Sequence, residues 1–295
     1  MAKASRALRG RMRSVQNTRK ITRTMELVST SKLKRAQDRV VAARPYAAAL
    51  AEVIGDLVTP ELAERFPLLR QPASPAKGGP TRAAVLLVTS NRGLCGGFNS
   101  NLIKEARRRL TQLEADGYQV DLHVVGRKGI GFFRYVGRAL ASQRIDIGDK
   151  PTAQHAIELV GGLIDDFSAG TLASLDVVCA RFNSPLSTPP TTLRVLPVAT
   201  PVKRKGGVQA DYILAPGPDE ILTQLLPLYV RNQVYRGLVE TAAAEHGARR
   251  TAMKSATDNA GDIYDLLKRT YNRQRQAAIT QEIAEIVGGA AALEG

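Results

Sequence analysis

The N-terminal segment of this chain contains almost nothing that would end an α-helix. Between residues 4 and 57 the only glycine after Gly10 is Gly55, close to the end of the segment. The one proline is Pro45, whose missing backbone donor predicts a kink or a break near Arg44. A helix of about 50 residues would be roughly 75 Å long, longer than a globular domain is wide. It must therefore pack against another long element, form a coiled coil or project into a partner. Apolar side chains at steps of three to six residues form its predicted stripe: Leu8, Met12, Val15, Ile21, Met25, Val28 and Leu33.

The end of the chain shows the same kind of pattern. Pro218 and Asp219 are a favourable helix start, and helical spacing then continues to about Val287, which predicts a helix approaching roughly 100 Å. Many of its apolar positions are alanines, which permit two helices to approach closely. The two ends are therefore expected to pair as a long antiparallel coiled coil. The apolar positions are Val239, Ala243, Met253, Ala256, Ala260, Ile263, Leu267, Ala278, Ile279, Ile283 and Ile286.

The middle of the chain follows a different pattern. Residues 71–80 are rich in proline, glycine and small side chains and predict a linker. Short apolar strands then alternate with helices, which is typical of a mostly parallel sheet covered on both faces. The predicted fold class is α/β, with a Rossmann-like domain inserted between the terminal helices. The predicted strands are residues 83–89, 119–125, 175–182 and 192–198, and the predicted helices between them are residues 98–115, 126–136 and 152–167. The predicted domains are residues 1–57 (first helix), 58–81 (linker), 82–200 (α/β domain), 201–217 (loop) and 218–295 (second helix).

The basic excess is concentrated at the N-terminus. Residues 1–44 hold 13 Lys and Arg against Glu26 and Asp38, a difference of +11 out of +15 for the chain. Such a segment meets nucleic acid, an anionic membrane or an acidic protein surface, and charge alone does not choose among them. Only 5% of residues are aromatic and there is no Trp, so stacking platforms for single-stranded nucleic acid are scarce. Nucleic-acid binding through this basic helix nevertheless stays open as one function of the chain. Such a protein would lose affinity for DNA steeply as the salt concentration rises.

Residues 89–99 lie where a strand becomes a helix, a common place for phosphate binding in α/β sheets. They contain no Gly-Lys-Ser/Thr sequence and lack the dinucleotide glycine spacing, so a structural turn is the favoured interpretation. Cys95 is expected to be a packed thiol, because no histidine has a local relationship to it. Cys95 and Cys179 are expected to remain reduced. We predict no catalytic residue, cofactor or metal site, and an enzyme built on this domain is the weakest of the three alternatives.

Polar side chains interrupt the apolar pattern near the C-terminus. They either form an ordinary solvated face or hydrogen-bond to a surrounding protein collar, and the pattern alone leaves both interpretations open. These side chains are Arg273, Arg275, Gln276, Thr280, Gln281, Glu282 and Glu285.

Several segments resemble the gamma subunit of F-type ATP synthases, in the same chain order. One begins RSVQNTRKIT, one reads RGLCGGFNSN, and the strongest includes YNRQRQAAITQE. Together they extend over nearly the whole chain. The matching segments are residues 13–22, 25–33, 92–101, 252–260, 271–282 and 286–290.

The resemblance implies a rotor shaft inside an α3β3 hexamer, with its foot on the epsilon subunit and the membrane ring of c subunits. It implies no catalytic site and no nucleic-acid partner. Because the resemblance begins almost at Met1, no transit peptide is expected, which indicates a bacterial protein held peripherally on the cytoplasmic side of the plasma (inner) membrane. The implied contacts to catalytic subunits are Met25, Arg275, Gln276, Thr280 and Glu285, and those to the c-ring or epsilon subunit are Tyr212 and Arg92.

The chain departs from the family pattern at three places. Asn91 stands where Asp is usual, and Leu214 and Ala215 replace a usual Tyr and Glu in the foot segment. The paired-cysteine insert of the chloroplast relatives is missing, so thiol regulation is not expected. The first two departures put particular polar contacts to partners in question.

Overall fold

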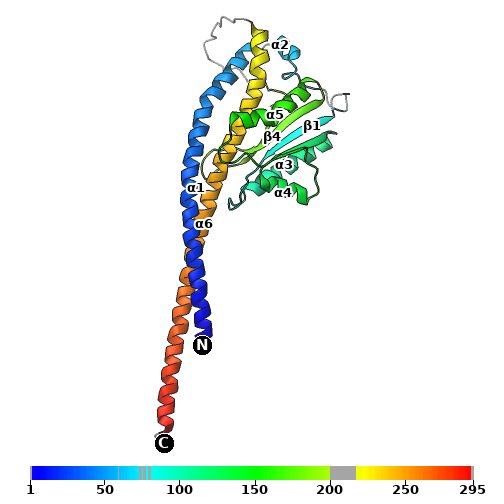
Figure 1. Cartoon of the computed structure of the whole chain (residues 1–295). Helices are drawn as coiled ribbons and strands as arrows, with labels where there is room; N and C mark the ends of the chain where they lie inside the picture. The colour runs from blue at the N-terminus through cyan, green and yellow to red at the C-terminus, as the bar shows by residue number, and fades with distance from the viewer. Residues whose placement is uncertain are drawn as a thin grey trace. The chain divides into compact units, whose positions relative to one another are not determined.

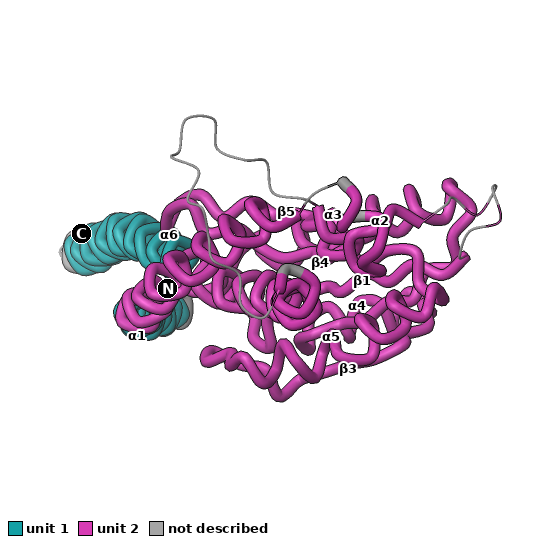
Figure 2. The backbone as a smooth tube through the Cα atoms, turned by 90° about the horizontal axis from the view of Figure 1, so that it is seen from above, with its two compact units in different colours: residues 1–29, 250–295 teal, residues 30–249 magenta. Residues whose placement is uncertain are grey.

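A computed structural model describes residues 2–58, 60–72, 75, 78, 81–199 and 217–293. The chain divides into two compact units: unit 1 contains residues 1–29 and 250–295, and unit 2 contains residues 30–249 (Figure 2). Two long helices, α1 (Ala2–Leu57) and α6 (Pro218–Leu293), contribute to both units (Figure 1). A five-stranded sheet lies between them in the chain order. The predicted fold class is confirmed.

Unit 1 is an antiparallel pair of helical segments. The hydroxyl of Thr257 donates to Thr22 over 2.8 Å, and the guanidinium of Arg9 donates to the hydroxyl of Tyr271 over 2.5 Å. Residue numbers therefore fall along α6 as they rise along α1. In the middle of unit 1 the buried positions are 22, 26 and 29 on one helix and 253, 257 and 260 on the other. Steps of four and three are the spacing of a coiled-coil seam.

The seam of unit 1 differs from the predicted apolar stripe. Thr22, Glu26 and Ser29 are buried, whereas Ile21 is 60% exposed and Val28 is 50% exposed. The half-buried positions 8, 12 and 15 are in phase with residues 22, 26 and 29, because a coiled coil keeps one seven-residue repeat. The predicted stripe was drawn through apolar side chains alone, and at residues 21 and 28 these side chains do not follow the seven-residue repeat. The stripe was thus predicted wrongly at residues 21 and 28, and these side chains remain available to a partner.

Unit 2 contains the remainder of both long helices. Helix α1 does not break near Arg44, because it continues through Pro45 to Leu57, and a kink there stays a prediction. Ala47, Leu50 and Ile54 are buried beyond the proline, so packing offsets the one lost backbone hydrogen bond. Helix α6 also contains a proline, Pro227, and ends six residues beyond the predicted Val287. Over the described part of the chain, no helix has an apolar stretch long enough to cross a membrane.

The sheet of unit 2 has the strand order β3-β2-β1-β4-β5. The first four strands are parallel neighbours, and β5 pairs antiparallel with β4 at the edge. The mostly parallel sheet was predicted correctly. The strands are β1 (Arg82–Val88), β2 (Gln119–Val125), β3 (Ser142–Arg144), β4 (Leu172–Ala180) and β5 (Pro190–Leu196). The shorter helices are α2 (Pro60–Arg65), α3 (Phe98–Ala115), α4 (Arg127–Tyr135) and α5 (Ala153–Ser168).

Both faces of the sheet are covered, as the continuous apolar strands predict. In β1, Ala84, Leu86 and Val88 belong to a core shared with α5 and with residues 50–57 of α1 and 222–238 of α6. The alternate residues of β1 belong to a second core, which α3, α4, residues 33–40 of α1 and residues 239–244 of α6 complete. Side chains alternate along a strand, so one strand supplies two cores.

Two elements are absent from the sequence prediction. Strand β3 is only three polar residues long and pairs with β2 from His123 to Val125. Helix α2 falls in the range predicted as a linker, where Leu68 and Leu69 are also buried. The proposed domain boundaries remain a prediction.

Candidate functional site

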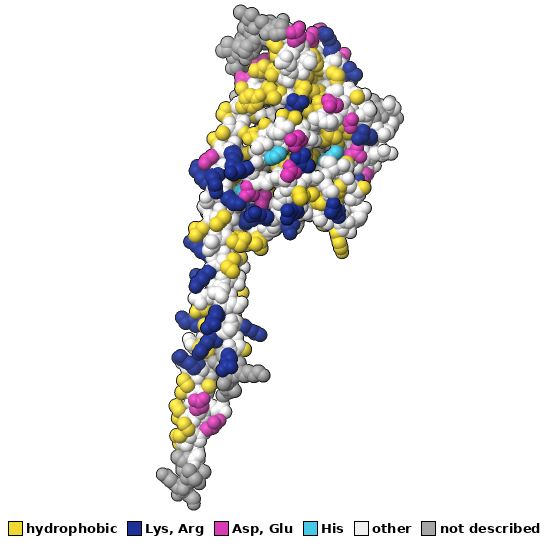
Figure 3. Space-filling view, in the orientation of Figure 1, with side chains coloured by type: hydrophobic (Ala, Val, Ile, Leu, Met, Phe, Trp, Pro, Cys, Tyr) yellow, Lys and Arg dark blue, Asp and Glu magenta, His cyan; other side chains and the backbone are white. Residues whose placement is uncertain are grey.

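The last part of α6, in unit 1, carries exposed aliphatic side chains. Ile279, Ile283, Ile286 and Val287 are 49%, 56%, 72% and 62% exposed. At about 100° per residue, they lie within an arc of roughly 100° on one face of the helix. We call these four residues the C-terminal apolar stripe. Apolar side chains are visible on this part of the chain in Figure 3. Uncovered apolar surface of this kind marks a place where another molecule binds.

The predicted polar contact residues divide around this stripe. By the same helical geometry, Arg275 lies just outside one border, Gln276 lies inside the arc near the other border, and Thr280 lies just outside that second border. All three are exposed. Glu285 lies well outside the arc and accepts a hydrogen bond from Gln281 over 2.8 Å. Helix geometry therefore groups three of the four predicted residues with the apolar stripe and separates Glu285 from it.

Met25 lies on α1 in unit 1 and is half-buried. Ile21 and Val28, four residues before it and three after it, share its face of the helix. Nearby, Arg23 forms an ion pair with the buried Glu26 over 3.0 Å. Lys and Arg side chains gather along unit 1 in Figure 3. This surface combines apolar and cationic side chains, which suits an acidic protein partner.

Of the two residues predicted to contact the c-ring or the epsilon subunit, Arg92 and Tyr212, the structure describes only Arg92. Arg92 is exposed in the loop that follows β1. Tyr212, together with the departures at Leu214 and Ala215, lies outside the described residues. Nothing in the structure therefore bears on the foot segment.

The loop after β1 is held by its own hydrogen bonds. The Thr89 hydroxyl donates to the Val125 carbonyl over 2.9 Å and accepts from the Gly129 amide over 3.0 Å. The Asn99 side chain accepts from the Ser90 amide over 3.0 Å. These bonds use groups that a phosphate would otherwise contact, which agrees with the interpretation of this segment as a structural turn.

Cys95 is a packed thiol, as predicted. Its side chain is buried and accepts a hydrogen bond from the Asn99 amide over 3.2 Å. Burial raises the pKa of the Cys95 thiol, and it raises the pKa of Cys179 to about 12. A thiol that stays protonated is a poor nucleophile.

Asn91 has a specific structural role that sequence reasoning missed. Its amide nitrogen donates to the carbonyls of Ile145 and Ile147 over 2.9 and 3.1 Å, and its side-chain oxygen accepts from the Arg127 amide over 3.0 Å. A carboxylate has no donor for the two carbonyls. The amide side chain therefore fits this backbone arrangement better than the Asp usual in the family.

A cluster of buried and half-buried charges joins four segments of unit 2. Arg249 of α6 donates to Glu245 over 2.6 Å and to the Gly93 carbonyl over 3.2 Å. Lys32 of α1 pairs with Asp149, which follows β3. The pKa of Glu245 is raised by burial, although the adjacent Arg249 opposes the shift. The cluster thus fixes the loops after β1 and β3 against the long helices of unit 2.

His246 is the neutral member of this cluster. Its side chain is only 3% exposed, and its Nε2 lies 3.5 Å from a carboxylate oxygen of Asp149. Burial lowers its pKa to about 4; Asp149 opposes this shift, and the cations Arg249, Lys32 and Arg35 add to it. The Arg249 guanidinium lies 3.4 Å from Nδ1. A neutral ring with its proton on Nε2 accepts from arginine and donates toward Asp149, so it satisfies both neighbours.

We expect His246 to make the chain less stable in mild acid. The unfolded histidine has a pKa near 6.5, so unfolding takes up a proton that the folded chain excludes. The stabilising contribution is fully present above about pH 6.5 and is lost as pH falls toward 4, by about 3 kcal/mol in total. Urea unfolding at several pH values measures it. His246→Gln should reduce the slope between pH 6.5 and 4, and an equal slope in both proteins would show that His246 is not responsible.

Comparison with known proteins gives a consistent result over the whole chain. The family model described as ATP synthase matches residues 4–293. The chain is similar to an ATP synthase gamma chain of Gemmatimonas aurantiaca, with 62% identity over 296 residues and 100% of both chains covered. It is 44% identical to an ATP synthase gamma chain of Moorella thermoacetica, covering 98% of this chain and 99% of the relative.

Solved structures with a similar fold come from mitochondrial ATP synthases. A chain in a Euglena gracilis structure of OSCP, F1 and c-ring has a TM-score of 0.68 at 17% identity, covering 99% of this chain and 95% of that one. A chain in a Tetrahymena thermophila central stalk and c-ring structure has a TM-score of 0.58 at 22% identity, covering 80% and 99%. At these identities the likeness concerns the fold.

Proposed function

We propose which surfaces of this chain meet other subunits, because the chain belongs to the ATP synthase family, among its gamma chains. It is a non-catalytic subunit and forms the central rotor stalk of an F-type ATP synthase, which couples ion-driven rotation to ATP synthesis.

In this proposal the end of α6 turns inside a collar of three alpha and three beta subunits. The observation that carries it is the C-terminal apolar stripe, which has large exposed aliphatic side chains on one helical face. A collar that buries these side chains removes apolar surface from water. Arg275, Gln276 and Thr280 border the stripe and supply hydrogen bonds that set orientation, since forked arginine donors suit carboxylates.

We also propose that the N-terminal part of α1 meets acidic surface segments of the catalytic subunits. Met25, with Ile21 and Val28, forms its apolar centre, and the surrounding cations supply charge complementarity. Glu285, which bonds to Gln281, is the weakest of the proposed contacts. Arg92 and Tyr212 are proposed to face the epsilon subunit or the c-ring.

The proposed location is the cytoplasmic side of a bacterial plasma membrane, with attachment through the c-ring. The two gamma chains described above, from Gemmatimonas aurantiaca and Moorella thermoacetica, are bacterial, which supports this assignment. The chain itself then needs no span across the bilayer.

Purification of an affinity-tagged chain from membranes tests the proposed partners. We expect alpha, beta, epsilon and c subunits to copurify in a complex that hydrolyses ATP, each identified by mass. A chain recovered without them, but with DNA whose binding falls steeply with salt, would favour the nucleic-acid alternative.

A further inference from the structure

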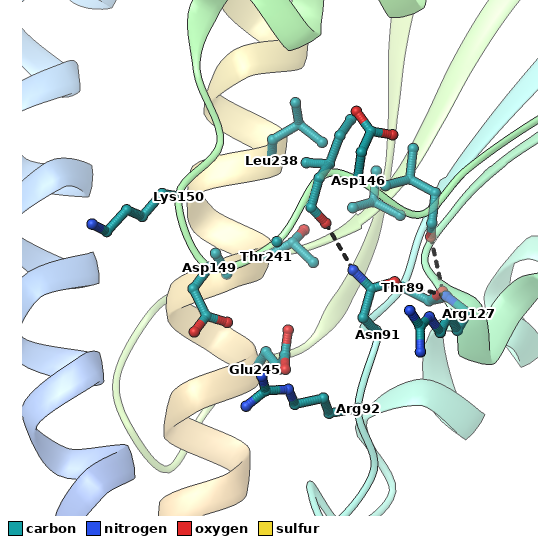
Figure 4. A pocket seen from close by; sticks show the side chains of 15 residues that line it. Thr89, Asn91, Arg92, Arg127, Asp146, Asp149, Lys150, Leu238, Thr241 and Glu245 are labelled. Carbon is teal, nitrogen blue, oxygen red and sulfur yellow. Dashed lines mark hydrogen bonds between the residues drawn. The ribbon is translucent and has the colours of Figure 1, made fainter.

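A cavity of about 550 Å³ lies at the carboxyl ends of β1 and β2 in unit 2 (Figure 4). Its walls come from the loop after β1, the start of α4, the loop after β3 and the facing turns of α6. Ligands in α/β sheets bind at this edge, and small-molecule sites have volumes of about 300–1,000 Å³. Of the residues in its wall, Arg92 is the one proposed above to face the epsilon subunit or the c-ring.

Four apolar side chains contribute to the wall of the cavity. Val88 and Val125 end the two strands, and Leu238 and Ala242 belong to α6. All four lie in the wall of the cavity, where the non-polar part of a metabolite would be shielded from water.

The acidic side chains of the cavity already have cationic partners. Asp146 pairs with Arg144 over 2.6 Å, and Glu245 pairs with Arg249 over 2.6 Å. Asp149 pairs with Lys32. The negative charges at the wall are therefore largely neutralised from outside the cavity.

The cationic side chains of the wall are not neutralised in this way. Across the described residues, Arg92, Arg127 and Lys150 form no ion pair within 4 Å, although Arg92 interacts electrostatically with Asp149. Figure 4 shows Arg127 beside Asn91, Arg92 extending toward Glu245, and Lys150 directed away toward α1. Two guanidinium groups therefore remain to receive an anion.

The backbone amides at the start of α4 do not provide a phosphate site. The Arg127 amide donates to Asn91 over 3.0 Å, the Lys128 amide to the Ser90 carbonyl over 3.2 Å, and the Gly129 amide to Thr89 over 3.0 Å. An anion in this cavity must therefore be held by side chains.

We propose that this cavity binds a small organic oxyanion, a carboxylate or phosphate ester with an apolar body. Arg92 and Arg127 hold the charged group, since guanidinium forks match both oxyanions. The apolar body lies against Val88, Val125, Leu238 and Ala242. Both parts are required, because inorganic phosphate would leave the apolar wall unfilled.

Titration of the full chain with simple probes tests this proposal. Phenyl phosphate and benzoate carry both features, whereas phenol lacks the charge and inorganic phosphate lacks the apolar body. We expect phenyl phosphate or benzoate to raise the unfolding temperature and to bind at least about 10-fold more tightly than either partial probe. Equal binding of phenol, or no binding of the two complete probes, would overturn the proposal.

Variants then locate the site. Replacing both Arg92 and Arg127 with Ala should weaken binding of the complete probes by about 10-fold or more, because charge-assisted hydrogen bonds are lost. Arg107→Ala is the matched control, since this exposed arginine of α3 lies outside the cavity wall. An equal loss in the control, or no loss in the double variant, would contradict the assignment. The same titration on the purified complex should give the same order of affinities.

Discussion

Replacing both Arg275 and Gln276 with alanine is expected to weaken assembly with the catalytic subunits strongly. Hydrogen bonds to a partner contribute about 1–3 kcal/mol each when one group is charged, so losing both sets of contacts costs roughly 2–6 kcal/mol. The two side chains are exposed and border the C-terminal apolar stripe. The fold of the chain alone should therefore be unchanged. Affinity for alpha and beta subunits and the rate of ATP-driven rotation measure the effect.

Two variants make this experiment selective. Gln274→Ala removes the same side chain from the opposite side of the helix, about 160° from Gln276 around the axis, and should leave assembly intact. Arg275→Lys keeps the charge but loses the planar fork, so we expect an intermediate loss. If the double alanine variant assembles and turns over normally, these residues form an ordinary solvated face.

Replacing Gly126 with alanine is expected to destabilise unit 2 by more than about 4 kcal/mol, which would leave much of the chain unfolded. Gly126 follows β2 with φ +98°, in the region that L side chains rarely adopt. A Cβ atom there would lie 2.1 Å from the Thr89 carbonyl oxygen. That oxygen belongs to the backbone beside β1, so it has little freedom to move away.

Gly137 provides the matched control for this substitution. Its φ is +77°, but a Cβ atom there would have nothing within 4 Å. Gly137→Ala should therefore cost only about 1 kcal/mol, the usual price of a left-handed conformation for a non-glycine residue. Urea unfolding of both variants compares the two costs. Similar losses in the two variants would show that backbone conformation, and not the contact with Thr89, sets the cost of replacing Gly126.

The sequence by itself determined the class of the fold and most of its elements. Helical spacing and the scarcity of helix breakers predicted both terminal helices, and β2 and α3 were predicted with the bounds that the structure has. These features are local, because each depends on periodicity along one continuous segment. The motifs also sufficed to identify the family, because they occur along this chain in the same order as in the family.

Only the tertiary structure decided how those segments meet. The pairing of β3 with β2, the burial of Thr22 in place of Ile21, and the two carbonyl contacts of Asn91 depend on residues distant in sequence. The cavity beside Arg92 and Arg127 has the same origin, because the loop after β3 and α6 complete its wall. Periodicity describes one element at a time, whereas a seam or a cavity is set by the phase and distance between elements.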